Sequence, residues 1–90
     1  MKKYYIYILT NKARGALYVG VTNDGERRFG ELPHSGQGHR SGLSRLVHIE
    51  QTERRETAIA RKRQLNGWHR EWKINLVEMT NPTWRDLSCE

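Results

Sequence analysis

The sequence predicts a small α+β domain in which a mostly antiparallel sheet is flanked by helices. Two segments of alternating apolar pattern, residues 4–9 and 17–21, stand on either side of a turn-forming stretch. A third alternating segment covers residues 45–52, and residues 54–68 have the spacing of an amphipathic helix. Strands joined by a short turn favour an antiparallel hairpin, and a helix with one apolar stripe can cover its buried face.

The first two segments, YYIYIL and LYVGV, form the predicted hairpin. The stretch between them, TNKARGA, contains an asparagine and a glycine that can adopt a positive φ. Symmetric pairing around this turn puts Tyr7 opposite Tyr18 and Tyr5 opposite Gly20. Directly opposite residues point to the same face, with Cβ atoms about 5 Å apart. We therefore predict that the hydroxyls of Tyr7 and Tyr18 project together.

The segments that follow the hairpin predict a short helix, a loop and a third strand. Near the start of residues 22–32, Asn23 is followed three residues later by Glu26, as in a capping box. Residues 33–44 are rich in glycine, serine and histidine, which is typical of a loop. In the third strand, strict alternation would put two pairs of side chains on opposite faces: Val47 with Ile49, and Leu46 with His48.

The C-terminal part predicts a helix, a last strand and a closing turn. The helix at residues 54–68 should end near Gly67, and its stripe contains Ala58, Arg61, Leu65 and Trp68. Residues 74–79, INLVEM, predict a last strand after a short helix. Residues 81–87 predict a turn that is anchored by Trp84.

Length and composition indicate a single domain over residues 1–90. With 36% hydrophobic and 29% charged residues, the chain is too apolar for a disordered protein. No apolar run approaches the roughly 18 residues of a membrane helix. The basic and then apolar N-terminus lacks a small-residue cleavage site, and the single cysteine, Cys89, fits a reducing compartment. We expect a cytoplasmic protein that has no membrane partner.

The chain is basic, with 16 lysines and arginines against 10 acidic residues and a formal net charge of +6. Such an excess favours polyanionic partners through phosphate contacts and counterion release, although a soluble basic surface is the alternative. Basic residues on the predicted helix form either a solvated face or a ridge that follows phosphates. The net charge favours the ridge, which consists of Arg54, Arg55, Arg61, Lys62 and Arg63.

Several blocks along the chain resemble the GIY-YIG nuclease superfamily. YIY at residues 5–7 stands for the first signature and YVG at residues 18–20 for the second, and the pair RR follows at residues 27–28. Residues 58–87, AIARKRQLNGWHREWKINLVEMTNPTWRDL, resemble the small stand-alone bacterial branch of that superfamily. The resemblance covers nearly the whole chain. It implies a nuclease fold in which a hairpin carries two tyrosines and the following helix carries an arginine.

The resemblance also implies a division of roles in phosphodiester cleavage. A tyrosine activates or orients the attacking water, an arginine stabilises phosphate charge, and a helix glutamate holds one Mg²⁺ or Mn²⁺ ion. At the matching positions the catalytic residues would be Tyr7, Tyr18 and Arg28. Cleavage needs an activated nucleophile and cations at the developing charge, which agrees with these roles. The contacts to nucleic acid would come from Arg27, Arg28, Arg61, Lys62 and Arg63.

Two positions depart from the pattern of the family. Leu32 stands where the family places a histidine, and His34 follows two residues later, beyond a proline. Lys62 stands where the family places its metal-binding glutamate. An ammonium group has no lone pair to offer to Mg²⁺, which requires oxygen ligands. We expect an endonuclease-like domain that binds DNA phosphates, has no metal ligand at position 62, and whose catalytic competence is open.

Two other functions remain as alternatives: an active metal-dependent DNA endonuclease of repair or structure-selective type, and a protein-interaction domain that uses its tryptophan-containing C-terminal surface. Three histidines match no standard zinc spacing and are expected to be solvated, namely His34, His39 and His48. Three tryptophans are expected to close the core rather than to stack on bases, namely Trp68, Trp72 and Trp84.

Overall fold

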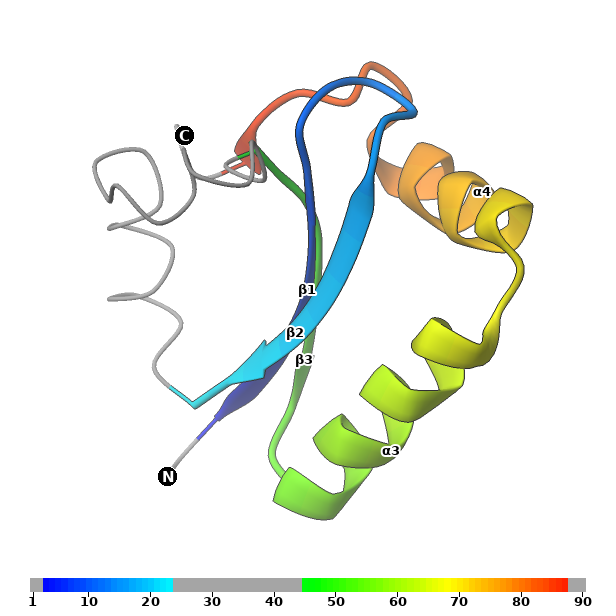
Figure 1. Cartoon of the computed structure of the whole chain (residues 1–90). Helices are drawn as coiled ribbons and strands as arrows, with labels where there is room; N and C mark the ends of the chain where they lie inside the picture. The colour runs from blue at the N-terminus through cyan, green and yellow to red at the C-terminus, as the bar shows by residue number, and fades with distance from the viewer. Residues whose placement is uncertain (1–2, 24–44, 88–90) are drawn as a thin grey trace.

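The computed structural model describes residues 3–23 and 45–87, which form a three-stranded antiparallel sheet and two helices (Figure 1). The elements are β1 (Tyr4–Thr10), β2 (Leu17–Thr22), β3 (Arg45–Thr52), α3 (Arg55–Gly67) and α4 (Arg70–Thr80). The predicted α+β class is confirmed. Nearly all of the predicted helix at residues 22–32 and all of the loop at residues 33–44 lie outside the described residues, as does Cys89.

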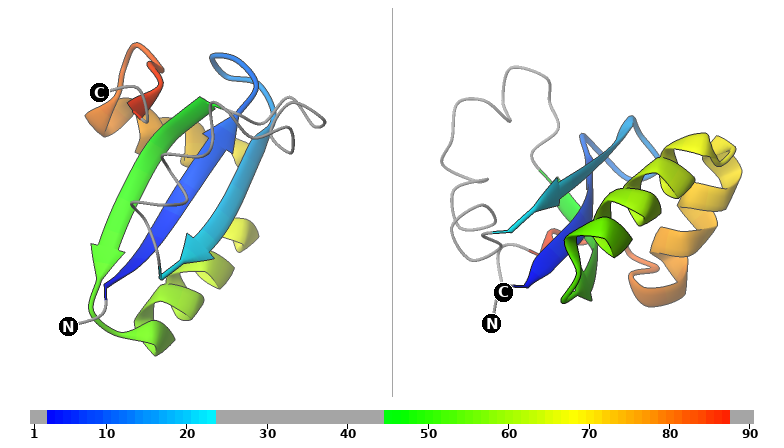
Figure 2. Two further views of the ribbon diagram at one scale, coloured as in Figure 1. Left: turned by 90° about the vertical axis from the view of Figure 1, so that its left-hand side faces the viewer. Right: turned by 90° about the horizontal axis from the view of Figure 1, so that it is seen from below.

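The central strand of the sheet is β1, which pairs with β2 on one side and with β3 on the other. Both helices lie on the same side of the sheet (Figure 2). The larger core cluster fills this side and contains Ile6, Ile8, Val19, Val47, Ala58, Leu65, Val77 and Trp84. Alternation along β1 sends the intervening side chains to the other side, where a smaller cluster contains Tyr7, Leu9, Leu46 and the partly buried Leu87.

The register of the hairpin differs from the prediction by two residues. Tyr7 pairs with Gly20, and Tyr18 pairs with Leu9. The turn causes the shift: the side chain of Asn11 accepts a hydrogen bond from the backbone N–H of Ala16, so residues 11–16 all belong to the connection. Because side chains alternate with a period of two, a shift of two residues leaves each of them on its predicted face. The two tyrosines are therefore diagonal neighbours on one face.

A β-bulge in β3 overturns the predicted alternation of that strand. The register changes between Ile8 and Leu9 of β1, so that Leu46 lies opposite Leu9 whereas His48 lies opposite Ile8. Leu46 and His48 consequently belong to opposite faces, although strict alternation put them on the same one. The extra residue, Val47, packs into the larger core on the helix side.

The predicted last strand at residues 74–79 is wrong, because these residues belong to α4. The segment is apolar with both strand-like and helix-like spacing, and in the helix Ile74 and Val77 pack against the larger core. Trp72 then faces outward and is 54% exposed, so the expectation that it closes the core is also wrong. Within the described residues, no helix is long and apolar enough to cross a membrane.

The helix α3 and the closing turn agree with the sequence. The helix α3 ends at Gly67 and buries Ala58 and Leu65 against the sheet. Trp84 is 2% exposed, and its indole N–H donates a hydrogen bond to the carboxylate of Glu78 at 2.8 Å. The same carboxylate accepts two hydrogen bonds from Arg14 in the β1–β2 turn, so Glu78 joins the hairpin to the C-terminal segment.

Candidate functional site

The two motif tyrosines meet on the sheet face that points away from the helices. Tyr7 is 4% exposed and Tyr18 is 45% exposed, and their ring centroids lie 6.4 Å apart at an interplanar angle of 49°. One ring is thus embedded in the protein while its neighbour is accessible to a ligand. The prediction that the two tyrosines come together is confirmed, although the pair is diagonal rather than directly opposite.

Gly20 supplies the space that the Tyr7 ring occupies. A Cβ atom added at Gly20 would lie 2.5 Å from both Cζ and Oη of Tyr7. Such a distance is far inside van der Waals contact, so a side chain at position 20 must displace the ring. The glycine of the YVG motif is therefore required by the position of the tyrosine in the YIY motif.

Gly20→Ala should displace the Tyr7 ring and lower the free energy of unfolding by about 1–3 kcal/mol, as expected for overpacking at a buried site. Urea denaturation followed by tryptophan fluorescence measures this loss. The matched control is Gly67→Ala, because an added Cβ there meets nothing within 4 Å. The control should leave stability unchanged or raise it by about 0.4–1 kcal/mol. Equal stability of the Gly20→Ala variant and the wild type would contradict the tight packing of Tyr7 on Gly20.

The remaining predicted site residues divide into two groups. Arg27, Arg28, Leu32, His34 and His39 lie outside the described residues, and their roles stay predictions. Arg61, Lys62 and Arg63 lie on α3, which packs against the other face of the sheet. The tyrosine pair and the basic residues of α3 are thus on opposite sides of the sheet, which the sequence did not indicate.

Lys62 belongs to a row of α3 that faces the edge strand β2. Residues at intervals of four and three share a helix face, which groups Arg55, Ile59 and Lys62. Arg55 and Ile59 line a pocket together with the C-terminal end of β2, and this fixes the direction of the row. Lys62 is half-buried, and no acidic partner contacts it within the described ranges. A ligand that contacts both Lys62 and the tyrosine pair has to lie across the edge of β2.

Arg61 points toward β3 instead and is held by an acidic residue. Its Nε and Nη2 atoms donate hydrogen bonds to the carboxylate of Glu50 at 2.8 and 3.0 Å, and its guanidinium lies 5.2 Å from the Trp68 ring centroid. Nε2 of His48 lies 2.9 Å from the same carboxylate. Burial raises the pKa of Glu50, but the hydrogen bonds with Arg61 and His48 outweigh burial and hold this pKa below its ordinary value. Arg61 therefore already has a strong partner.

The described residues do not fit the divalent metal that the GIY-YIG pattern implies. The resemblance predicts a carboxylate where Lys62 stands, and the ammonium of a lysine repels a cation. Glu50 is engaged by Arg61 and His48, and Glu78 is engaged by Arg14 and Trp84. Within residues 3–23 and 45–87, no three histidine, cysteine or acidic side chains gather into a possible metal site. His48 is 5% exposed and was expected to be solvated, so that expectation is wrong.

Comparison with known families gives a match to the GIY-YIG catalytic domain over residues 3–75. The chain belongs to the GIY-YIG family. This range includes both motif tyrosines and Lys62. Membership of the GIY-YIG family supports a nuclease-like function, and GIY-YIG nucleases are generally metal-dependent.

A curated relative of this GIY-YIG chain is a UPF0213 protein of Haloquadratum walsbyi. The two sequences are 34% identical over 79 residues, which cover 83% of this chain and 86% of the relative. The similarity therefore extends over most of both proteins. No solved structure matches this chain.

Proposed function

We propose that this GIY-YIG chain binds DNA through its phosphates and does not cleave it by the metal-dependent reaction of the family. The tyrosine pair presents the exposed ring of Tyr18 beside the buried ring of Tyr7, so one aromatic side chain of the pair is accessible to a ligand. The formal net charge of +6 supplies the electrostatic attraction for a polyanion.

The single observation that carries the proposal is Lys62. Lys62 is half-buried on the row of α3 whose other members, Arg55 and Ile59, line the pocket at the end of β2, and it has no acidic partner within the described ranges. A cation that has no acidic partner attracts an anionic ligand. A phosphate diester provides that negative charge, whereas a metal ion adds a second positive charge.

The experiment measures DNA affinity and DNA cleavage on the same preparation. Wild-type protein should bind a labelled duplex, and its affinity should fall as salt is added. A plot of log affinity against log salt concentration should have a slope of about −0.9 for each phosphate contact. Plasmid DNA incubated with Mg²⁺ or Mn²⁺ should remain intact. Absence of binding at low salt would overturn the proposal. In that case the exposed apolar stripe of α4, with Trp72 and Met79, would favour the protein-interaction alternative.

A second candidate is an active metal-dependent endonuclease, and the preserved tyrosine pair favours it. Metal-dependent cleavage that Tyr7→Phe and Tyr18→Phe both abolish would establish this candidate. The phenylalanine variants retain ring packing and remove only the hydroxyls, so they separate chemistry from folding. Cleavage that persists in both variants would instead indicate a contaminating nuclease.

A further inference from the structure

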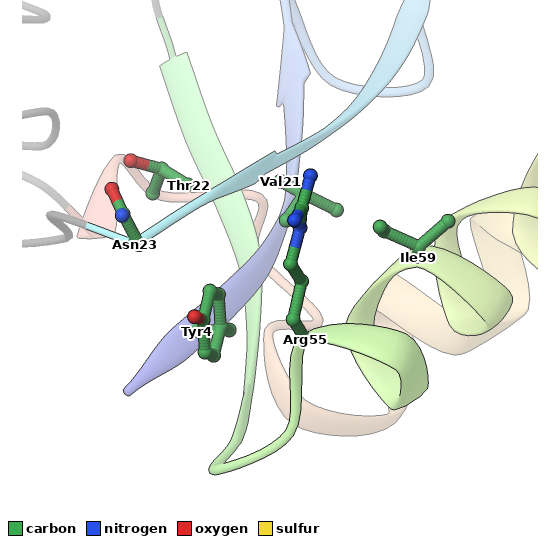
Figure 3. Close-up of a pocket in the computed structure, with 6 residues that line it drawn as sticks. All are labelled: Tyr4, Val21, Thr22, Asn23, Arg55 and Ile59. Atoms are coloured by element: carbon green, nitrogen blue, oxygen red, sulfur yellow. The ribbon is translucent and has the colours of Figure 1, made fainter. Parts of the chain in front are cut away.

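A pocket lies between the end of β2 and the first two turns of α3 (Figure 3). Its volume is about 530 Å³. The lining residues are Tyr4, Val21, Thr22, Asn23, Arg55 and Ile59. The lining includes one cation and no acidic side chain, so the pocket is suited to an anion.

Arg55 gives the pocket its charge. Figure 3 shows its side chain extending from the start of α3 past Val21, with Ile59 beside it. Within the described ranges no acidic side chain pairs with its guanidinium. The adjacent Arg54 differs, because its side chain is 76% exposed and lies 3.9 Å from the carboxylate of Glu56. Of these two neighbouring arginines, only Arg55 is directed into a pocket.

Arg55 and Lys62 lie on the same row of α3, seven residues apart. Seven residues of α-helix span about 10.5 Å along the helix axis. The two cations are therefore far enough apart to contact different phosphates of one DNA backbone. Both face the edge of β2, and Tyr18 is exposed on the other side of that strand.

We infer that Arg55 is a further DNA contact, which binds another phosphate of the strand that Lys62 and the tyrosine pair contact. This inference rests on the proposed function. The DNA backbone then crosses the edge of β2, with one group of contacts on each side of the sheet. The pocket admits the phosphate to Arg55, and the apolar surfaces of Val21 and Ile59 support the stem of the arginine.

The test compares Arg55→Gln with the matched control Arg54→Gln, which removes the same charge from the neighbouring residue. Fluorescence anisotropy with a labelled DNA duplex gives the affinity of each protein over a series of salt concentrations. Arg55→Gln should reduce the slope of log affinity against log salt by about 0.9, the value for one lost phosphate contact. Arg54→Gln should change the slope by less than half of that amount, because this arginine lies outside the pocket.

The double variant Arg55→Gln with Lys62→Gln should reduce the slope by about 1.8, since two contacts on one backbone are lost. Thermal unfolding of each variant checks that the fold is retained. If the wild type binds DNA, two results would overturn the inference and leave the proposed function standing. One is an equal change of slope in Arg54→Gln and Arg55→Gln, and the other is no change of slope in Arg55→Gln. Failure of the wild type to bind DNA would overturn both.

Discussion

Lys62→Glu should bind Mn²⁺ in isothermal titration calorimetry under conditions in which the wild type shows no binding. The substitution places a carboxylate on the row of α3 that also contains Arg55 and Ile59, which line the pocket at the end of β2. Carboxylate oxygen is the ligand type that hard divalent cations prefer. The same substitution removes a cation from the DNA surface. Without added metal, the salt slope of DNA binding should therefore fall by about 0.9.

Two controls separate the effects of charge and ligand. Lys62→Gln removes the cation without adding a carboxylate, so it should reproduce the loss of DNA affinity and gain no metal binding. Arg63→Glu places a carboxylate on the next residue, about 100° around the helix, where it should gain no metal binding either. Lys62→Glu without any gain in Mn²⁺ affinity would show that position 62 is not at the metal position of the family.

Recovery of cleavage needs more than the metal. The resemblance predicts a histidine where Leu32 stands, so we expect a proton-transfer or hydrogen-bonding partner to be absent as well. Leu32→His combined with Lys62→Glu is therefore the stronger trial of recovered activity on plasmid DNA. Robust metal-dependent cleavage by the wild type would contradict the assignment of Lys62 as the residue that prevents catalysis.

Trp84→Ala should lower the free energy of unfolding by about 3–5 kcal/mol, a large share of the roughly 5–15 kcal/mol that stabilises a typical domain. The indole is 2% exposed in the larger core cluster, and its N–H hydrogen bond to Glu78 is lost with it. Trp84 also has a φ of 58°, in the left-handed region that costs a non-glycine residue about 1–2 kcal/mol. Packing of the indole must therefore outweigh this backbone strain.

Urea denaturation of purified variants measures the effect, and Trp72→Ala is the matched control. Trp72 is 54% exposed, so the same truncation there should cost less than half as much. Similar losses at the two tryptophans would contradict the assignment of Trp84 as the anchor of the C-terminal turn.

The fold was largely predictable because its strands and α3 have clear apolar periods. The shared face of Tyr7 and Tyr18 was predictable for the same reason. An even shift of the pairing register leaves each side chain on its face, and only an odd shift moves it to the other face. Their diagonal relation was not predictable, because it depends on the side chain of Asn11 within the turn and on a φ of 55° at Arg14. The sequence also did not show that residues 74–79 are helical. Their apolar pattern fits the period of a strand as well as that of a helix, and tertiary packing decides between the two.

The candidate site was likewise predictable only in part. Motif spacing predicted the two tyrosines and the lysine as site residues, because each is a property of one position in the chain. The pairing of Arg61 with Glu50 and the pocket around Arg55 depend instead on how α3 sits on the sheet. Neither has a signal in the local sequence. The basic residues of α3 form one run along the chain, but packing directs Arg61 toward β3 and Arg55 toward β2.

The strand order also affects how the chain folds during synthesis. β1 is made first but occupies the centre of the sheet, so one of its edges stays unpaired until β3 has been synthesised. Thirty residues separate the end of β2 at Thr22 from the end of β3 at Thr52. At roughly 5–20 residues per second, translation takes about 1.5–6 s to cover that distance. An unpaired edge can add a strand from another nascent chain. Aggregation is therefore a greater hazard in this interval on the ribosome than in the finished fold.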